Sequence, residues 1–154
     1  MKSTSVDALK KIPVLSRLTE DDLKIMSRRM EFQTVDSGKM LLNEGEKGDF
    51  ICFVANGRLD VVKKTYTDHE IVLNTLSRGQ SFGEMSLIES LPRSASVKAI
   101  IQTDIIKLTR ADFDLIMEQH TEIGIKILKG ISLLLSKKLR HTTSRLIDYM
   151  STGA

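Results

Sequence analysis

The stretch FGEMSLIESLPRSASV, residues 82–97, combines in one short segment the features that a site for an anion needs. Gly83, and Gly79 just upstream, permit backbone conformations and close approaches that a side chain would block. Residues Glu84 to Glu89 fit one or two helical turns, and the first amides of a helix have no intrahelical partner. Arg93 follows a proline that restricts the backbone, so its guanidinium and these amides are predicted to hold a phosphate together.

Glu84 is a carboxylate in a place where a bound phosphate would be repelled. The conflict disappears if the ligand also carries a sugar hydroxyl, because the carboxylate accepts a hydrogen bond from that hydroxyl while Arg93 neutralises the phosphate. Glu84 and Arg93 together therefore predict a compact ligand with a sugar and a phosphate. From the chemistry alone, the alternative is a Glu–Arg ion pair that stabilises a surface turn.

Around this stretch the sequence is typical of an antiparallel β-domain. After Met30, short apolar runs alternate with turn residues, and about eight strands at this spacing indicate a sandwich, a jelly roll or a small barrel. Asn56-Gly57 lies between FICFVA and RLDVV, and this pair predicts a tight hairpin between those two strands. The apolar runs are MLL, FICFV, LDVV, IVLNTL, SVKAII and DIIKL.

Helical spacing of apolar residues appears before and after the β-region. Thr19 and Asp22 form a capping-box pattern, which predicts a helix from Glu20 to about Arg29. Thr109 and Asp112 form a second such pattern and predict another short helix.

A long helix is predicted to begin at a cap formed by Thr121. Its apolar residues form two stripes, whereas a helix that only covers its own domain commonly has a single broad apolar face. We therefore expect one stripe to face the domain and the other to face a second copy of the chain. The first stripe is Ile127, Ile131 and Leu134, and the second is Leu128, Ser132, Leu135, Leu139, Thr142, Leu146 and Tyr149.

Length and composition bound the class of protein. The 154 residues suffice for one compact domain. No apolar run is long enough to cross a bilayer and the N-terminus lacks the apolar core of a secretory signal, so we expect a cytoplasmic protein without a membrane partner. Cys52 is the single cysteine and is predicted to be a core residue. His69, His120 and His141 are scattered without a nucleophile or paired carboxylate, so neither an enzyme nor a metal site is predicted.

The charge of the chain is concentrated in its last helix. Residues 121–150 contain six basic and two acidic residues, a net charge of +4, while the whole chain carries +3. A DNA-associated protein that uses this helix is one alternative, although without a recognition helix its binding would be weak and indifferent to sequence. A solvated helix face is the simpler interpretation.

The stretch at residues 82–97 closely resembles the phosphate-binding cassette of the cyclic nucleotide-binding domain family, found in cyclic-AMP-dependent kinase regulatory subunits, cyclic-nucleotide-gated channels and the catabolite activator group. The resemblance extends over nearly the whole chain. It implies an eight-stranded jelly-roll β-barrel with N-terminal helices and a long C-terminal helix. The single domain, 1–154, would comprise an N-terminal helical part (1–30), a β-barrel (31–108) that contains the cassette (79–97), and C-terminal helices (109–150).

The resemblance also implies roles for individual residues. Arg93 would pair with the cyclic phosphate and Glu84 would accept the ribose 2′-hydroxyl, while Ser94 would donate to the phosphate. Thr143 and Ser144 are similar to a Thr-and-small-residue pair that reaches the purine in the bacterial activators. The complete set of candidate ligand-binding residues is Phe82, Gly83, Glu84, Met85, Ser86, Arg93, Ser94, Ala95, Val97, Thr143 and Ser144.

The function implied is that of a non-enzymatic, stand-alone sensor that binds a 3′,5′-cyclic nucleotide, with cyclic AMP expected over cyclic GMP and no other cofactor. Its output would pass through movement of the C-terminal helix to an effector protein, and the same helix would form a homodimer. The alternatives are a structural dimer with a vestigial pocket and the DNA-associated protein described above. The cassette departs from the common pattern at Ser90-Leu91, where a glycine or small residue often precedes the proline.

Overall fold

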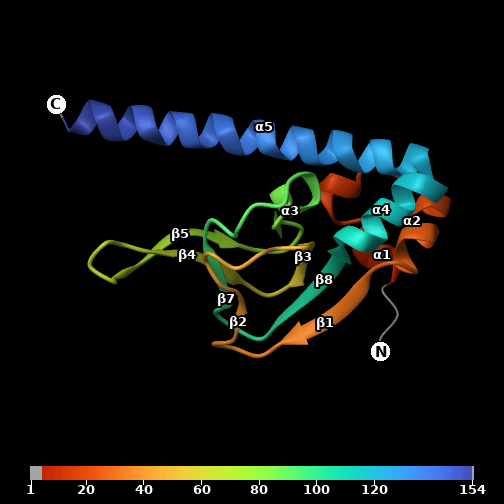
Figure 1. Cartoon of the computed structure of the whole chain (residues 1–154), viewed down its shortest axis with the longest axis horizontal. Helices are drawn as coiled ribbons and strands as arrows, with labels where there is room; N and C mark the ends of the chain where they lie inside the picture. The colour runs from red at the N-terminus through yellow and green to blue at the C-terminus, as the bar shows by residue number, and fades with distance from the viewer. Residues whose placement is uncertain (1–4, 154) are drawn as a thin grey trace.

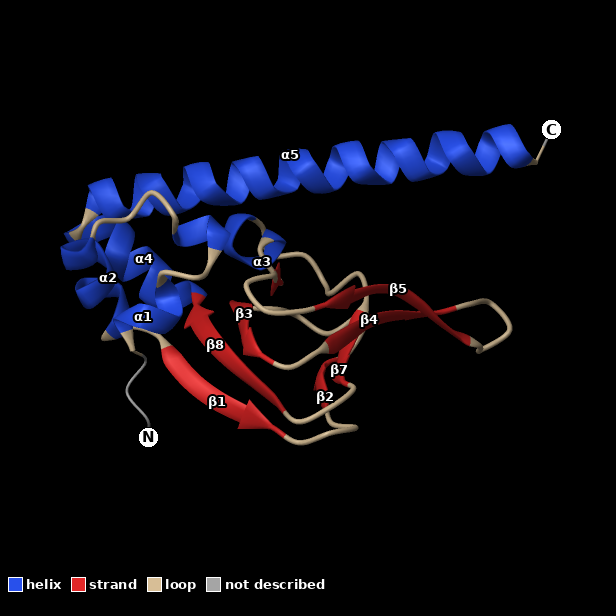
Figure 2. Ribbon diagram, turned by 180° about the vertical axis from the view of Figure 1, so that it is seen from behind, coloured by secondary structure: helices blue, strands red, loops and turns tan. Residues whose placement is uncertain are grey.

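The computed structural model describes residues 5–153, which form two four-stranded antiparallel sheets and a set of helices (Figures 1 and 2). The strand orders are β1-β8-β3-β6 and β2-β7-β4-β5. This confirms the predicted mainly β fold with N-terminal helices and a long C-terminal helix, although the two sheets do not close into one barrel. The elements in chain order are α1 (Val6–Leu9), η1 (Pro13–Leu15), α2 (Glu20–Ser27), β1 (Glu31–Val35), β2 (Met40–Leu42), β3 (Phe50–Asn56), β4 (Leu59–Lys64), β5 (Glu70–Leu76), β6 (Ser81–Phe82), α3 (Met85–Ile88), β7 (Ser96–Ala99), β8 (Thr103–Thr109), α4 (Arg110–Gln119) and α5 (Thr121–Thr152).

Strand β3 separates two hydrophobic cores. Its side chains alternate, so Ile51 and Phe53 pack against the helices, whereas Cys52 and Val54 lie in the core between the two sheets. Burial on both faces explains why this strand is a continuous apolar run. Cys52 is fully buried, as predicted, and burial raises the pKa of its thiol to about 12.

The Asn56-Gly57 turn does not close a hairpin, so this prediction was wrong. Strand β3 pairs with β6 and β8, while β4 pairs with β5 and β7, so the turn carries the chain from one sheet to the other. Gly57 has a φ of +111°, and a Cβ added there would lie 2.4 Å from Thr103 Oγ1. A residue with a side chain would be strained here and would clash with Thr103, so this turn between the sheets requires glycine, as a tight hairpin turn would.

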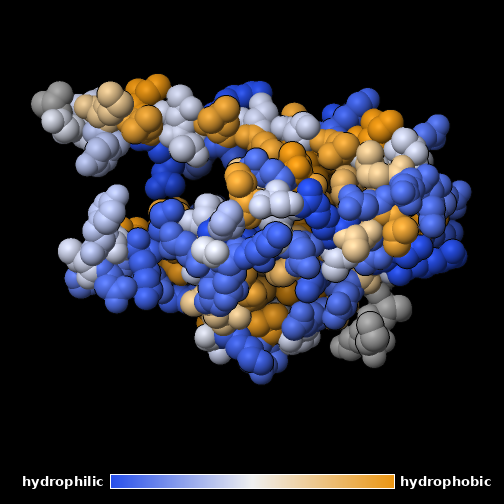
Figure 3. Space-filling view, in the orientation of Figure 1, coloured by the Kyte–Doolittle hydropathy of each residue, from blue (hydrophilic) through white to orange (hydrophobic). Residues whose placement is uncertain are grey.

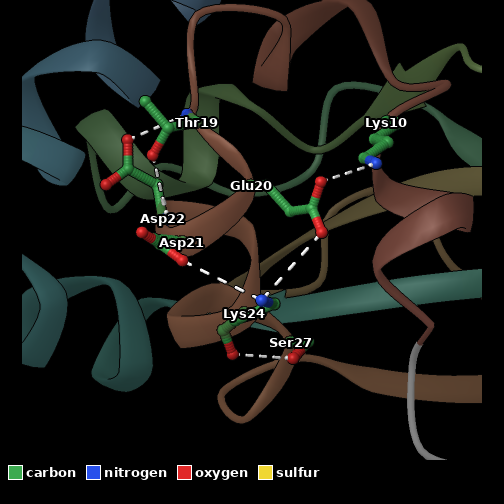
Figure 4. Close-up of polar contacts among 7 residues, drawn as sticks. All are labelled: Lys10, Thr19, Glu20, Asp21, Asp22, Lys24 and Ser27. Carbon is green, nitrogen blue, oxygen red and sulfur yellow. Dashed lines mark hydrogen bonds and ion pairs between the residues drawn. The ribbon is translucent and has the colours of Figure 1, made fainter.

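The N-terminal helices are fixed to the rest of the domain by α2. The predicted capping box is confirmed: the Thr19 hydroxyl accepts from the amide of Asp22, and an Asp22 carboxylate oxygen accepts from the amide of Thr19 (Figure 4). The helix ends at Ser27, two residues before the predicted end. The same Asp22 oxygen accepts from Lys126 Nζ of α5 at 2.8 Å, so one carboxylate caps α2 and joins it to the long helix.

Two helix starts were predicted after the β-region, and one of them differs from the prediction. Thr109 caps α4 by accepting from the amide of Asp112, and the two side chains are also hydrogen-bonded. Thr121 was predicted to cap α5, but this was wrong because the cap position is His120 and Thr121 is already helical. The Thr121 hydroxyl instead donates to the carbonyl of Met117, at the end of the preceding helix.

Helix α5 is anchored over its first half and extends beyond the helical cluster toward the β4–β5 hairpin (Figures 1 and 2). Gly130 lies against η1 so closely that an added Cβ would be 2.1 Å from the Val14 carbonyl oxygen. Ile127 and Ile131 of the first apolar stripe are buried, whereas Leu139 of the second stripe has an exposed fraction of 69%. No helix within residues 5–153 is long and apolar enough to span a bilayer.

Candidate functional site

A cavity of about 840 Å³ lies between the cassette, the β4–β5 hairpin and the second half of α5. Figure 3 shows the molecule hollowed below this part of the helix. Thr143 and Ser144, two of the predicted ligand-binding residues, do not line the cavity. The other predicted residues all do: Phe82, Gly83, Glu84, Met85, Ser86, Arg93, Ser94, Ala95 and Val97.

Arg93 brings a buried positive charge to the wall of this cavity. Its exposed fraction is 8%, and burial lowers its pKa. Nη1 donates to Ser86 Oγ at 2.7 Å and Nη2 donates to the carbonyl oxygen of Phe50 at 3.0 Å. Among residues 5–153, no carboxylate forms an ion pair with this guanidinium. Its charge is therefore available to an anion in the cavity.

The backbone of Arg93 is held by the turn between β2 and β3. The Arg93 amide donates to the carbonyl of Glu46 at 2.7 Å, and the amide of Gly45 donates to the Arg93 carbonyl at 2.8 Å. Gly45 has a φ of +85°, which a residue with a side chain rarely adopts. The turn Glu44-Gly45-Glu46 between β2 and β3 thus fixes the backbone of the cassette at Arg93.

Glu84 brings a buried negative charge to the same cavity, with an exposed fraction of 5%. Its Oε1 is paired with Nζ of Lys138, which reaches into the site from α5 and also donates to the Ser81 carbonyl at 3.4 Å. Within the described part of the chain, Glu84 Oε2 is buried and has no hydrogen-bond partner. A buried acceptor without a partner is costly, so this oxygen is suited to receive a donor from a ligand.

The Glu84–Arg93 ion pair, which was the alternative to a ligand site, does not form. Each residue has its own partners: Lys138 for Glu84, and Ser86 and Phe50 for Arg93. Because Lys138 neutralises Glu84, the three charged side chains together carry one net positive charge. Lys138 thus reduces the repulsion that Glu84 would exert on an anion in the cavity, a contribution that the sequence did not indicate.

Helix α5 contributes one face to the cavity, and sequence reasoning had chosen other residues of this helix. Thr143 faces elsewhere, and its hydroxyl donates to the Leu139 carbonyl at 2.8 Å. The residues of α5 that line the cavity are Lys138, His141, Thr142, Arg145 and Leu146. Their spacing of three and four residues is visible in the sequence, but it does not reveal which face of the helix meets the barrel.

Comparison with known proteins identifies the fold and the family. The model of the family described as "Cyclic nucleotide-binding domain" matches residues 32–120. The cGMP-dependent protein kinase of Plasmodium berghei (strain Anka) is 34% identical over 112 residues, which are 73% of this chain and 12% of that protein. The chain spans between 7% and 32% of the length of eight curated relatives of this kind.

Solved structures agree with this result. A cyclic nucleotide-binding domain from Methylobacillus flagellatus KT superposes with a TM-score of 0.84 at 24% identity, covering 94% of this chain and 81% of that one. The regulatory domain of Toxoplasma gondii PKA, solved with cAMP, gives a TM-score of 0.65 at 27% identity, covering 72% of this chain and 42% of that one. The chain belongs to the cyclic nucleotide-binding domain family.

Proposed function

We propose that the cavity binds a 3′,5′-cyclic nucleotide, with cyclic AMP as the expected ligand and cyclic GMP as the alternative. One observation carries this proposal: within residues 5–153, the wall of a single cavity holds a buried cation without an ion pair and a buried carboxylate oxygen without a hydrogen-bond partner. Arg93 would hold the cyclic phosphate and Glu84 Oε2 would accept the ribose 2′-hydroxyl. A cyclic nucleotide supplies an anion and a hydroxyl donor within one small ring system, which matches both unfilled requirements.

Lys138 has a part in this mechanism. A phosphate beside an uncompensated carboxylate would be repelled, and Lys138 cancels that repulsion by pairing with Glu84 Oε1. The other carboxylate oxygen has no hydrogen-bond partner in the part of the chain that the structure describes, so it can accept from the ribose. The site with Lys138 carries one net positive charge, and a cyclic nucleotide carries one negative charge on its phosphate.

The remaining contacts follow from the lining of the cavity. The cassette residues Phe82, Gly83, Met85, Ser86, Ser94, Ala95 and Val97 would surround the sugar and phosphate. For the base, we propose Thr142 in place of Thr143 and Ser144, because Thr142 lies on the face of α5 that lines the cavity. Relatives named for each nucleotide exist, a cGMP-dependent kinase and a PKA regulatory domain solved with cAMP, so the choice between cyclic AMP and cyclic GMP has to be measured.

The domain would act as a non-enzymatic sensor whose output passes through α5 to an effector protein. Lys138 lies on the second half of α5, beyond the buried residues Gly130 and Ile131. A change in the contacts of Glu84 would therefore act on this half of the helix through the Lys138–Glu84 ion pair. If α5 has one position with ligand and another without it, the ligand shifts the equilibrium between them only to the extent that its affinities for the two positions differ. Thr142 and Leu146 of the second stripe line the cavity, but Leu139 and Tyr149 of the same stripe are exposed and lie outside it. These two residues support the proposal of a homodimer through this helix, which sizing chromatography with and without cyclic AMP would test.

Calorimetric titration with cyclic AMP and cyclic GMP tests the proposed function. Arg93→Ala is expected to weaken binding by about 2–5 kcal/mol, because it removes a desolvated charge partner of the phosphate. Arg17→Ala is the matched control, since Arg17 is exposed and does not line the cavity. Absence of binding by the unmodified protein would leave a structural dimer with a vestigial pocket as the better hypothesis, and equal binding by Arg93→Ala would refute the role of Arg93.

A further inference from the structure

Phe50 makes two kinds of contact with the buried guanidinium. The Cζ atom of Arg93 lies 4.7 Å from the centroid of the Phe50 ring, and the Phe50 carbonyl oxygen accepts from Nη2 at 3.0 Å. We propose that Phe50 is a positioning residue for Arg93, with its ring acting as a platform on which the guanidinium is presented to an anion. This inference rests on the proposed function, and it adds a residue that the sequence did not suggest.

The ring is suited to this task because it attracts a cation without neutralising it. A carboxylate partner would cancel the charge of Arg93 and compete with a phosphate. The face of an aromatic ring offers a weaker attraction through its quadrupole, so the full positive charge stays available. Arg93 is buried and has no ion pair among the described residues, so attraction of this kind offsets part of the desolvation of the charge.

The surroundings leave the guanidinium little freedom to move. A Cβ added to Gly48 would lie 2.1 Å from Arg93 Nε, and one added to Gly83 would lie 2.5 Å from Nη1. Two glycines thus allow the backbone to approach the guanidinium closely, while Ser86 accepts from Nη1. The ring of Phe50 completes an enclosure whose other walls are backbone and a small hydroxyl.

The position of Phe50 follows from the sheet. Phe50 is the first residue of β3 and pairs with Thr109 of β8, and Cys52 pairs with Lys107 two residues further along. Because alternate residues of a strand share a face, the side chains of Phe50 and Lys107 lie on the same face of the sheet. The Nζ atom of Lys107 lies 4.2 Å from the centroid of the same ring. The Phe50 ring therefore contacts two cations, Arg93 and Lys107.

Titration of cyclic AMP into Phe50→Leu and Phe50→Tyr tests the inference. Leucine keeps the apolar bulk and the backbone carbonyl but loses the ring, so its affinity should fall about 2- to 30-fold, the range of a cation–π contact. Tyrosine keeps the ring and should bind within about twofold of the unmodified protein. Unfolding midpoints of both variants are measured alongside, and Phe50→Met replaces the leucine variant if that one does not fold.

Two further readouts separate positioning from a general effect on the fold. In an Arg93→Ala background, Phe50→Leu should cause no additional loss of affinity, because the ring acts only through the guanidinium. In the ligand-free protein, the NMR resonance of Arg93 Hε should lose its ring-current shift in Phe50→Leu and keep it in Phe50→Tyr. Unchanged affinity in a folded leucine variant, or an equal loss in the Arg93→Ala background, would overturn the inference. Failure of the unmodified protein to bind would overturn the proposed function itself, and the two failures are therefore distinguishable.

Discussion

Replacement of Lys138 by methionine removes the cation that pairs with Glu84 and keeps an unbranched side chain of similar length. Glu84 is buried, whereas the Lys138 side chain has an exposed fraction of 41%, so the pair lies between a surface ion pair and a buried one. Exposed pairs contribute about 0.2–1 kcal/mol. Breaking a buried pair costs about 3–5 kcal/mol. We therefore expect Lys138→Met to lower the free energy of unfolding by about 1–3 kcal/mol.

The effect on ligand binding follows from the same charge. Without Lys138, Glu84 is an uncompensated carboxylate in the cavity that we propose as the phosphate site, so the affinity for cyclic AMP should fall about 10- to 100-fold. Lys138→Arg keeps the charge and should retain most of the affinity. Lys137→Met is the matched control, because Lys137 is the neighbouring residue, is exposed and does not line the cavity.

A double-mutant cycle with Glu84→Gln measures the pair directly. Urea unfolding of Lys138→Met, Glu84→Gln and the double variant should give a coupling energy of at least about 1 kcal/mol, since each single change leaves the other partner unsatisfied. Additive effects within about 0.5 kcal/mol would refute the reasoning. So would an Lys138→Met variant that binds cyclic AMP as tightly as the unmodified protein.

Three further predictions concern the stability of the fold. Asp22→Asn should lower the free energy of unfolding by about 1 kcal/mol at pH 7, because the carboxylate caps α2 and pairs with Lys126. Burial would raise the pKa of Asp22, but hydrogen bonds from Lys126 and from the Thr19 amide outweigh this effect, so the pKa is lowered. The contribution of Asp22 to the free energy of unfolding is therefore present above the unfolded pKa near 4 and is lost as the pH falls through the folded pKa. Gly130→Ala should destabilise the protein by about 1–3 kcal/mol in urea unfolding, because the new methyl group would overlap the Val14 carbonyl. Cys52, with a pKa of about 12, should react with iodoacetamide in mass spectrometry only when the chain unfolds.

Each of these predictions has a contradicting result, and the first two have a matched control variant. Asp21→Asn is the control for Asp22, since Asp21 is almost fully exposed, and an acid dependence that Asp22→Asn leaves unchanged would argue against the linkage. Ser132→Ala is the control for Gly130 on an exposed part of the same helix, and a Gly130→Ala variant of unchanged stability would contradict the close approach to η1. Rapid labelling of Cys52 in the native protein would contradict its burial.

The sequence predicted those features of the fold that depend on local pattern. The capping box at Thr19, the helix cap at Thr109 and the buried run of β3 follow from residues that are close together in the chain. Asn56-Gly57 predicted a turn but not the strands that it connects, because a positive φ at Gly57 is compatible with a hairpin and with a crossing between sheets. Strand β6 is only two residues long and offers no period to detect.

The candidate site was predictable where it lies in one stretch of chain and not where two distant segments meet. All the cassette residues that were chosen line the cavity. Lys138 was missed because its partner is 54 residues away and nothing near it in the sequence marks it as different from Lys137. Thr143 was preferred to Thr142 because Thr143-Ser144 resembles the Thr-and-small-residue pair of the bacterial activators. One residue turns a helix by about 100°, and only the packing of α5 decides which hydroxyl faces the cavity.

The most direct measurement compares cyclic AMP with 2′-deoxy cyclic AMP by calorimetry, using the unmodified protein, Glu84→Gln and Arg93→Ala. If Glu84 receives the ribose hydroxyl, the unmodified protein should prefer cyclic AMP by about 1.5–3 kcal/mol, the contribution of a hydrogen bond to a charged group. Glu84→Gln should lose most of this preference, whereas Arg93→Ala should weaken both ligands alike. An equal affinity of the unmodified protein for the two nucleotides, or a preference that Glu84→Gln leaves intact, would contradict the shared grip of Glu84 and Arg93 on one cyclic nucleotide.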